Sequence, residues 1–334
     1  MLILGIDTSC DDTAAAVVED GQRILSNIVS SQNEIHSKYG GIVPELASRK
    51  HIEMIIPVVN EAMIEAGVRF DEISAIAVSR GPGLIGSLLV GVCFAKSLSF
   101  TKNIPLVAIN HLEGHIFSIF LEANPGYPFL ALVVSGGHTS FYRVDGFGLY
   151  SELGRTRDDA AGEAFDKVAK LLGFGYPGGP IIDALAATGN PDAIAFPRTF
   201  MKESYDVSFS GLKTSVLNYT KKYPGSKKED IAAGFQSAVI EILVKRTLDL
   251  ACLTKVRNIV LSGGVAANSA LRRQIKEKTI DIGLDVYLPS LNLCTDNAAM
   301  IAAAGYHHFR THKIADYTLN PVAYLTLGSA DGQP

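Results

Sequence analysis

The stretch LILGIDTSCDDTAAAVV, residues 2–18, decides the fold of the first part of the chain. An apolar run ends in a small polar loop at residues 7–13, and a second apolar run follows at once, which predicts two paired strands. The same pattern returns in FLALVVSGGHTSFYRV, residues 129–144. A strand, a polar loop and a strand that occur twice predict a duplicated α/β arrangement.

The remaining apolar patterns predict helices and buried strands around these two repeats. Helices are expected over residues 44–66, 87–99, 163–172, 228–253 and 296–310, and further strands over 24–29, 73–79, 106–109, 258–261 and 286–289. Residues 173–180 hold too much glycine and proline for a regular element.

Three loops place glycine, serine or threonine at the end of a buried strand, at residues 7–9, 135–139 and 262–265. Glycine permits close approach of an anionic ligand, and the N–H groups of a turn form an anion-binding nest. One such loop is usually an ordinary turn, but three in a duplicated chain favour a site for nucleotide phosphates. None matches the Walker A or GxGxxG pattern, so neither a P-loop nor a Rossmann dehydrogenase is supported.

A pair of histidines, His111 and His115, has the spacing that brings two imidazoles to one face of a helix. Asp296, which opens an alanine-rich helical pattern, is the candidate for a third ligand. Two histidines and one carboxylate would leave coordination positions open for substrate. Two histidines at this spacing are also common as ordinary buried polar residues. The spacing does not support a zinc protease, because Glu113 stands one position later than the general base of such enzymes.

Composition describes an ordinary globular protein: 334 residues, 47% hydrophobic and 19% charged. No uninterrupted apolar run reaches the length of a membrane span, and the amino terminus lacks the features of a signal peptide. The four cysteines show no CxxC spacing, so we expect a reducing, cytoplasmic location. A net charge of −4 requires that any RNA site be a local basic patch.

Five motifs occur in order along the chain: DTSCD (7–11), NHLEGH (110–115), VSGGHT (134–139), SGGVAAN (262–268) and TDN (295–297). Together they resemble the TsaD family, also called Gcp and formerly labelled O-sialoglycoprotein endopeptidase, in its bacterial form. The resemblance covers nearly the whole chain. It implies an α/β fold with two RNase H-like lobes of the actin, Hsp70 and sugar-kinase (ASKHA) type around a nucleotide cleft. Residues 1–110 with about 297–325 would form the first lobe, 111–296 the second with helical insertions, and 326–334 a loose tail.

The resemblance also implies an activity, the transfer of a threonylcarbamoyl group from threonylcarbamoyl-AMP to N6 of the adenosine 3′ to the anticodon. The tRNAs would be those that read ANN codons, and AMP would leave. One iron or zinc ion per chain would be held by His111, His115 and Asp296. Residues expected to bind the substrate adenylate, or ATP or ADP, are Thr8, Ser9, Val133, Val134, Ser135, Gly136, Gly137, His138, Asp166, Gly179, Asp183 and Asn268.

The expected catalytic residues are Asp11 and Asp12, which follow Cys10. The adenine amine is a poor nucleophile, and a carboxylate such as Asp11 could accept its proton during attack. The family usually has glutamate at the position of Asp12, so Asp11 is the stronger candidate.

The sequence carries only a weak signal for contact with tRNA. Basic residues gather in the second lobe at Lys202, Lys213, Lys221, Lys222, Lys227, Lys228, Arg272 and Arg273. Such runs are usually solvated faces. The resemblance implies partners that help: a TsaB-like paralogue, a TsaE-like ATPase, and a TsaC or Sua5-type enzyme that supplies the intermediate, with no membrane.

Two other functions use the same fold. A small-molecule kinase would hold Mg²⁺ through carboxylates and phosphates and would leave the histidine pair unexplained. A non-catalytic nucleotide-binding scaffold would need no transition metal.

Overall fold

The computed structural model describes residues 1–201 and 203–328. Its contacts divide the chain into two compact units, Met1–Asn124 with Pro289–Pro334 and Pro125–Leu288. The predicted boundaries need correction, because residues 111–124 and 289–296 belong to the first unit and not to the second. The reason is that the helix of residues 111–117 packs on the helix of residues 298–310. Lys202 and residues 329–334 of the expected tail lie outside the described residues.

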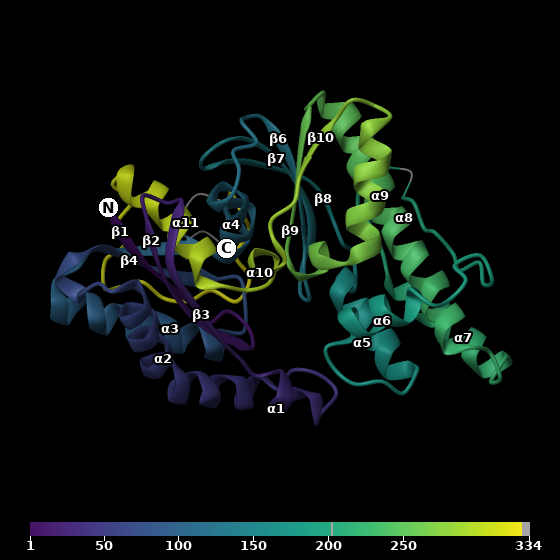
Figure 1. Ribbon diagram of the computed structural model, residues 1–334, viewed down its shortest axis with the longest axis horizontal. Helices are drawn as coiled ribbons and strands as arrows, with labels where there is room; N and C mark the ends of the chain where they lie inside the picture. The colour runs from purple at the N-terminus through teal and green to yellow at the C-terminus, as the bar shows by residue number, and fades with distance from the viewer. Residues whose placement is uncertain (202, 329–334) are drawn as a thin grey trace. The chain divides into compact units, whose positions relative to one another are not determined.

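The first unit is built on a five-stranded sheet with the order β3-β2-β1-β4-β5 (Figure 1). The strands are β1 (Leu2–Asp7), β2 (Asp12–Glu19), β3 (Arg23–Ser31), β4 (Ile73–Gly81) and β5 (Leu106–Asn110). The strands expected at residues 2–18 and 24–29 form an antiparallel meander of β1, β2 and β3, whereas β4 and β5 run parallel to β1. The polar loop of residues 8–11 thus joins the first two strands.

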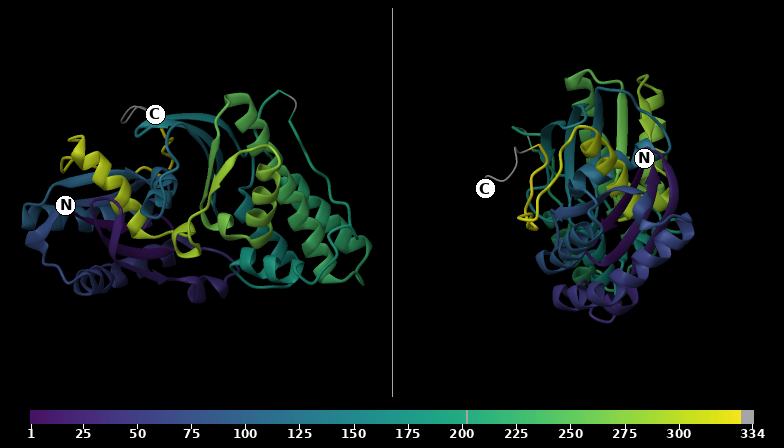
Figure 2. Two further views of the ribbon diagram at one scale, coloured as in Figure 1. Left: turned by 45° about the horizontal axis from the view of Figure 1, so that its top comes forward. Right: turned by 90° about the vertical axis from the view of Figure 1, so that its left-hand side faces the viewer.

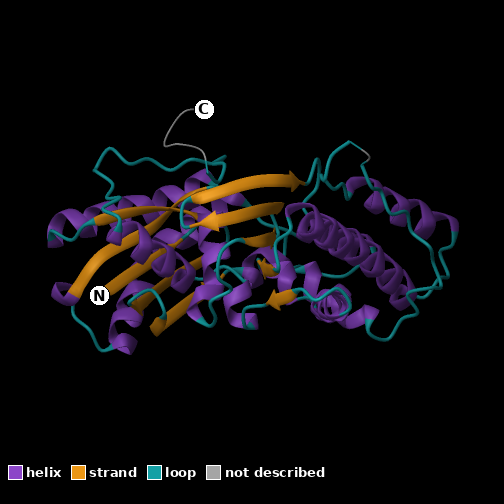
Figure 3. Ribbon diagram, turned by 90° about the horizontal axis from the view of Figure 1, so that it is seen from above, coloured by secondary structure: helices purple, strands orange, loops and turns teal. Residues whose placement is uncertain are grey.

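Alternation along β1 sends side chains to opposite faces of this sheet. Leu4 and Ile6 belong to a core that also holds Ile55 and Val92 from the helices of one face. Gly5 points the other way, where an added Cβ would lie 2.2 Å from the carbonyl oxygen of Ala298. Glycine at this position therefore allows a helix to approach the strand closely. Figure 3 shows helices on both faces of these strands.

The helices of the first unit are α1 (Asn33–Ser37), α2 (Pro44–Ala66), α3 (Ile85–Lys102), α4 (His111–Phe117), α10 (Leu291–Cys294) and α11 (Ala298–Arg310), with 3₁₀ turns η1 (Phe70–Glu72) and η2 (Ser118–Leu121). Helix α2 starts with proline at its first position and ends at Gly67, whose φ is 67°. Proline at the first position favours the start of a helix, and glycine after the last residue favours its end.

Helix α3 is long and apolar enough, by length and composition alone, to cross a membrane. The core helix of a globular domain passes the same test, and Leu88, Val92 and Ala95 of α3 are buried against the sheet.

The second unit repeats the topology of the first, with strand order β10-β9-β6-β7-β8. Its strands are β6 (Phe129–Val134), β7 (Thr139–Gly146), β8 (Leu149–Arg155), β9 (Asn258–Ser262) and β10 (Asp285–Tyr287). Here too the first three strands are antiparallel, and the last two run parallel to the first. The duplication predicted from residues 2–18 and 129–144 is therefore confirmed.

The helices of the second unit are α5 (Ala161–Leu171), α6 (Gly178–Ala186), α7 (Ser210–Lys222), α8 (Lys228–Thr254) and α9 (Ser269–Ile280), with the 3₁₀ turn η3 (Gly264–Ala267). Phe165 of α5 and Phe235 of α8 meet edge to face in its core, 5.2 Å between ring centroids. The expectation that residues 173–180 lack regular structure is wrong at its end, because Gly178 already begins α6. Figure 2 gives two further views of these elements.

Candidate functional site

The two histidines follow directly from the end of a parallel strand. Asn110 ends β5, and its side-chain oxygen accepts the N–H of Leu112 at 2.9 Å, which caps α4. His111 is the first residue of α4 and His115 lies one turn later, so both imidazoles project from the same side of the helix. His115 is fully buried and His111 nearly so.

Gly114 lets the carboxylate approach these histidines. An added Cβ on Gly114 would meet the side chain of Ile301 at 2.8 Å, so glycine allows α11 to pack tightly on α4. Asn297 caps α11 by accepting the N–H of Met300 at 3.0 Å. The prediction that Asp296 opens this helix is therefore wrong, because Asp296 lies just before the cap residue Asn297.

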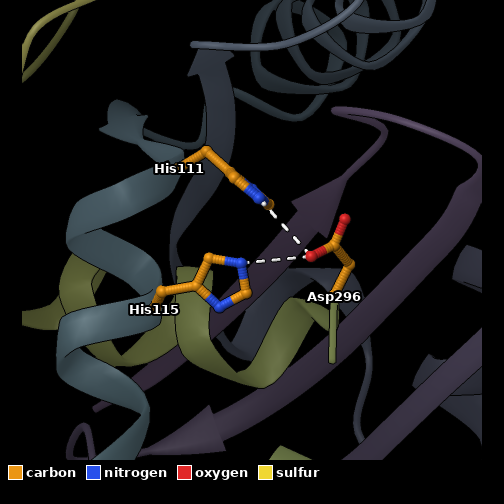
Figure 4. A group of neighbouring side chains, drawn as sticks. All are labelled: His111, His115 and Asp296. Carbon is orange, nitrogen blue, oxygen red and sulfur yellow. Dashed lines mark ion pairs between the residues drawn. The ribbon is translucent and has the colours of Figure 1, made fainter. Parts of the chain in front are cut away.

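The three predicted ligands converge on one point (Figure 4). Oδ1 of Asp296 lies 3.1 Å from Nε2 of His115 and 3.5 Å from Nε2 of His111. One possible ligand atom from each residue lies within 4.8 Å of the others. All three belong to the first unit, and no other such cluster of histidine, cysteine and acidic residues occurs among residues 1–201 and 203–328.

The electrostatics of this cluster favour a cation. Burial alone would lower the pKa of His111, but the charges of Asp7 and Asp296 outweigh it and raise that pKa to about 10. Burial alone would raise the pKa of Asp296, but the two histidines hold it well below its usual range. The same negative charge that retains a proton on an imidazole would stabilise a metal ion in its place.

The donor atoms also fit a metal. Both ring nitrogens of His115 are buried without a hydrogen-bond partner, although Nε2 lies close to Asp296. Buried polar atoms normally have such a partner, so these nitrogens are suited to hold a metal ion. Two imidazoles and one carboxylate suit zinc or non-haem iron with open coordination positions.

Asp7, which the sequence analysis did not place among the ligands or the binding residues, lies behind His111. It ends β1, is 1% exposed, and its Oδ2 is 3.3 Å from Nδ1 of His111. Its Oδ1 accepts the N–H of Ser9 at 3.0 Å. A carboxylate on the second ring nitrogen is typical of metal-binding histidines. The only sequence signal was an acidic residue at the end of a buried strand.

A second pair that was not predicted joins the two helices of the site. Glu113, between the histidines, is 3% exposed, and its Oε2 lies 2.7 Å from Nε2 of His308 on α11. This contact ties α4, which carries two candidate ligands, to the helix that follows the third.

The loop that carries the expected catalytic acids is held by His51 of α2. Its Nε2 donates to the carbonyl oxygen of Cys10 at 3.0 Å, since that oxygen can only accept, and its Nδ1 lies 2.8 Å from Oγ1 of Thr13. Burial lowers the pKa of His51, which favours a neutral ring with its proton on Nε2. Asp11 lies in the loop and is 9% exposed. Burial and the charges of Asp11 and Asp296 raise the pKa of Asp12 to about 7.

The side chains of Thr8 and Ser9, both expected to bind substrate, face the protein interior. The Thr8 hydroxyl donates to the carbonyl oxygen of Ser87 at 2.8 Å. Ser9 is 2% exposed. Substrate contact from these two residues would therefore come through the backbone of the loop.

In the second unit, the loop between β6 and β7 has the expected tight turn. The N–H of Ser135 donates to the carbonyl oxygen of His138 at 2.8 Å, and the N–H of His138 donates to Oγ of Ser135 at 3.2 Å. Gly136 and Gly137 are exposed, with no neighbouring atoms where a Cβ would lie. Val133 and Val134 are in the core, so only their backbone can face a ligand.

The expected nucleotide residues of this unit form two groups, each tied to the start of a helix. Asp166 accepts the N–H of Gly178 at 2.6 Å, which places Asp166 at the start of α6, next to Gly179. Asp183 accepts both the N–H and the hydroxyl of Ser269, at 3.0 and 2.9 Å. Asn268 caps α9 through its oxygen. These carboxylates thus already have partners within the protein, as helix-capping acids do.

The chain is similar to known proteins over most of its length. A family model for TsaD, tRNA N6-adenosine threonylcarbamoyltransferase, matches residues 23–303. A protein of that name from Thermodesulfovibrio yellowstonii is 59% identical over 335 residues, covering 98% of this chain and 100% of the relative. Another from Syntrophus aciditrophicus is 55% identical and covers 99% of both.

Similar solved structures show the fold alone. The activator of the 2-hydroxyisocaproyl-CoA dehydratase from Clostridium difficile, with bound ADPNP, is 16% identical with a TM-score of 0.55, covering 94% of this chain and 97% of that one. Full-length HypF in its phosphate- and nucleotide-bound form is 16% identical with a TM-score of 0.61, covering 91% and 54%. These are proteins of the ASKHA type, as the sequence motifs had implied. From the matching family model and these relatives of full length, the chain belongs to the TsaD family of tRNA N6-adenosine threonylcarbamoyltransferases.

Proposed function

We propose that this transferase moves the threonylcarbamoyl group of threonylcarbamoyl-AMP to N6 of the adenosine 3′ to the anticodon, in tRNAs that read ANN codons. A C–N bond forms between N6 and the carbamoyl carbon, the bond from that carbon to the phosphate oxygen breaks, and AMP leaves. The observation that carries the proposal is the convergence of His111, His115 and Asp296 in a chain of this family.

One iron or zinc ion, held by His111, His115 and Asp296, would supply a Lewis acid for the oxygens of the threonylcarbamoyl group. Because the substrate already contains a good leaving group, the protein mainly needs to position it and to stabilise charge. The exposed backbone at Gly136 and Gly137 is suited to contact an anionic group. Asp166, Gly179, Asp183 and Asn268 remain the proposed contacts of the adenylate.

Asp11 is the proposed acceptor of the proton that N6 loses. The ring nitrogen of His51 that donates to Cys10 fixes the backbone next to Asp11, which keeps this carboxylate in place. Asp12 is the weaker candidate, because a general base must be an ionised carboxylate. Its pKa of about 7 leaves a substantial part of it protonated near neutral pH.

The proposal includes the partners that the sequence motifs imply and a cytoplasmic location without membrane attachment. The partners are a TsaB-like paralogue, a TsaE-like ATPase and a TsaC or Sua5-type enzyme that makes the intermediate. The kinase and scaffold alternatives would leave two buried imidazoles facing one carboxylate without a role.

The test is incubation of the purified chain with threonylcarbamoyl-AMP and unmodified tRNA, with and without the partner proteins. The modified nucleoside is measured by mass spectrometry, and the metal by elemental analysis. We expect about one iron or zinc per chain, and loss of both metal and product in His111→Ala and Asp296→Ala. His312→Ala, at an exposed histidine, is the matched control and should retain both. Full modification by the two ligand variants would refute the metal assignment.

A further inference from the structure

The positive charge of this protein is concentrated in its second unit. Residues 125–288 contain 20 lysines and arginines against 17 aspartates and glutamates, whereas the rest of the chain contains 10 against 17. A polyanion should therefore be attracted to the second unit and repelled by the first. The family's tRNA substrate is such a polyanion.

Most basic side chains with a defined partner in this unit are neutralised by a carboxylate. The paired residues are Arg143, Arg155, Arg157, Lys167, Arg198, Lys245 and Arg257. Several exposed cations of this unit have no such partner among the described residues, and four of them lie together: Lys221 and Lys222 at the end of α7, and Lys227 and Lys228 at the start of α8. Within the described part of the chain, none of their ammonium groups lies within ion-pair distance of a carboxylate.

Aromatic rings lie next to two of these four lysines. Nζ of Lys222 lies 5.2 Å from the ring centre of Tyr223, and Nζ of Lys228 lies 4.8 Å from that of Phe174. Tyr223 is 47% exposed, so part of its ring remains open to solvent. The rings of Tyr223 and Tyr219 pack together with their centroids 4.9 Å apart.

The turn that joins the two helices is held in one shape. The N–H of Ser226 donates to the carbonyl oxygen of Tyr223 at 3.1 Å, and its hydroxyl donates to the hydroxyl of Tyr219 at 3.4 Å. Pro224 occupies a position of this turn where proline presets the backbone. A preordered turn loses little conformational entropy on binding.

We propose that Lys221, Lys222, Tyr223, Lys227, Lys228 and Phe174, here called the α7–α8 patch, bind the tRNA substrate. The lysines would contact backbone phosphates, and Tyr223 would offer a stacking surface to an unpaired base. Both helices lie at the right-hand side of Figure 1. This inference rests on the proposed function, because it assumes that tRNA is the substrate.

RNA explains the patch better than an acidic membrane or an acidic protein. A membrane surface would need apolar side chains to insert, but the turn between the lysine pairs consists of Tyr223, Pro224, Gly225 and Ser226. Unpaired cations beside an exposed aromatic ring are the combination found where proteins bind single-stranded nucleic acid.

The test compares two sets of substitutions in the full chain. The patch variant carries Lys→Gln at 221, 222, 227 and 228. The matched control removes the same charge from four exposed residues of the same unit, as Lys255→Gln, Arg257→Gln, Lys276→Gln and Lys278→Gln. Affinity for unmodified tRNA is measured by fluorescence anisotropy over a range of salt concentrations. We expect the patch variant to bind at least about 30-fold more weakly at low salt, with a log–log salt slope shallower by about 3.

Tyr223→Ala should weaken binding by about tenfold while the salt slope stays unchanged, because stacking involves no counterion release. Equal losses in the patch and control variants, or no loss in the patch variant, would overturn the proposal. So would binding of the wild type to phosphatidylglycerol vesicles that depends on these lysines while tRNA affinity does not. Failure of the proposed function is a separate result, in which the wild type binds tRNA but makes no modified nucleoside.

Discussion

Asp7→Asn should weaken metal binding by about 10- to 100-fold, the usual effect of losing the carboxylate behind a metal-binding histidine. Asp7 accepts the N–H of Ser9 with Oδ1, and its Oδ2 lies 3.3 Å from Nδ1 of His111. Asparagine has nearly the same shape and would keep its oxygen on Ser9. Its NH₂ group would then face Nδ1 of His111 and would require that nitrogen to accept, which places the ring proton on Nε2. Nε2 is the nitrogen that faces Asp296, so the proton would occupy the ligand position.

The assay is competition for Zn²⁺ against a chelating indicator, combined with thermal unfolding of the metal-free protein. Asp206→Asn is the matched control, since this carboxylate also accepts a backbone N–H, at 2.9 Å from Arg155, but belongs to the second unit. The metal-free Asp7 variant should unfold more easily than the wild type, because His111, which a pKa of about 10 keeps protonated, loses one of its two carboxylate partners. Zinc affinity within twofold of the wild type would refute the tautomer argument. An equal loss in the Asp206 variant would show that the effect is not local.

Three further outcomes follow from the packing and charges of the described residues. Folding raises the pKa of Asp12 from an ordinary 3.8 to about 7, so the folded protein favours protonated Asp12. The free energy of unfolding therefore falls as the pH rises through this range. In chelator-treated protein, Asp12→Asn should therefore unfold at a higher denaturant concentration than the wild type at pH 8, by up to about 4 kcal/mol, and should match it near pH 4. Gly5→Ala should cost about 2–3 kcal/mol in urea unfolding, since its Cβ would lie 2.2 Å from a backbone oxygen, whereas Gly211→Ala in α7 has open space and should stabilise by up to about 1 kcal/mol. In a double-mutant cycle, Glu113→Gln and His308→Gln should couple by about 1–3 kcal/mol in unfolding free energy, and additive effects would contradict their contact.

The sequence predicted the elements of the fold well where periodicity was strong. The helices at residues 44–66 and 228–253 and the meander at the start of the chain are present within a residue or two of their expected ends. These segments are long, and their apolar spacing is regular, so local information suffices. The start of α6 at Gly178 was missed because glycine and proline suggest a loop wherever tertiary contacts are unknown.

The candidate site was predictable only in its most recognisable residues. His111, His115 and Asp296 stand in motifs, and the structure brings them together as expected. Asp7, His51 and His308 act through contacts with residues far away in sequence, which no local pattern reveals. The lobe boundaries were misplaced for the same reason, since only the packing of α4 on α11 assigns residues 111–124 to the first unit.

All three candidate ligands come from one compact unit, although Asp296 is separated from the histidines by the whole of the other. No hinge motion of residues 125–288 would by itself change the distances among His111, His115 and Asp296. A metal held by these three side chains would therefore be independent of any movement of residues 125–288, and the metal content of a preparation would carry no information about such a movement.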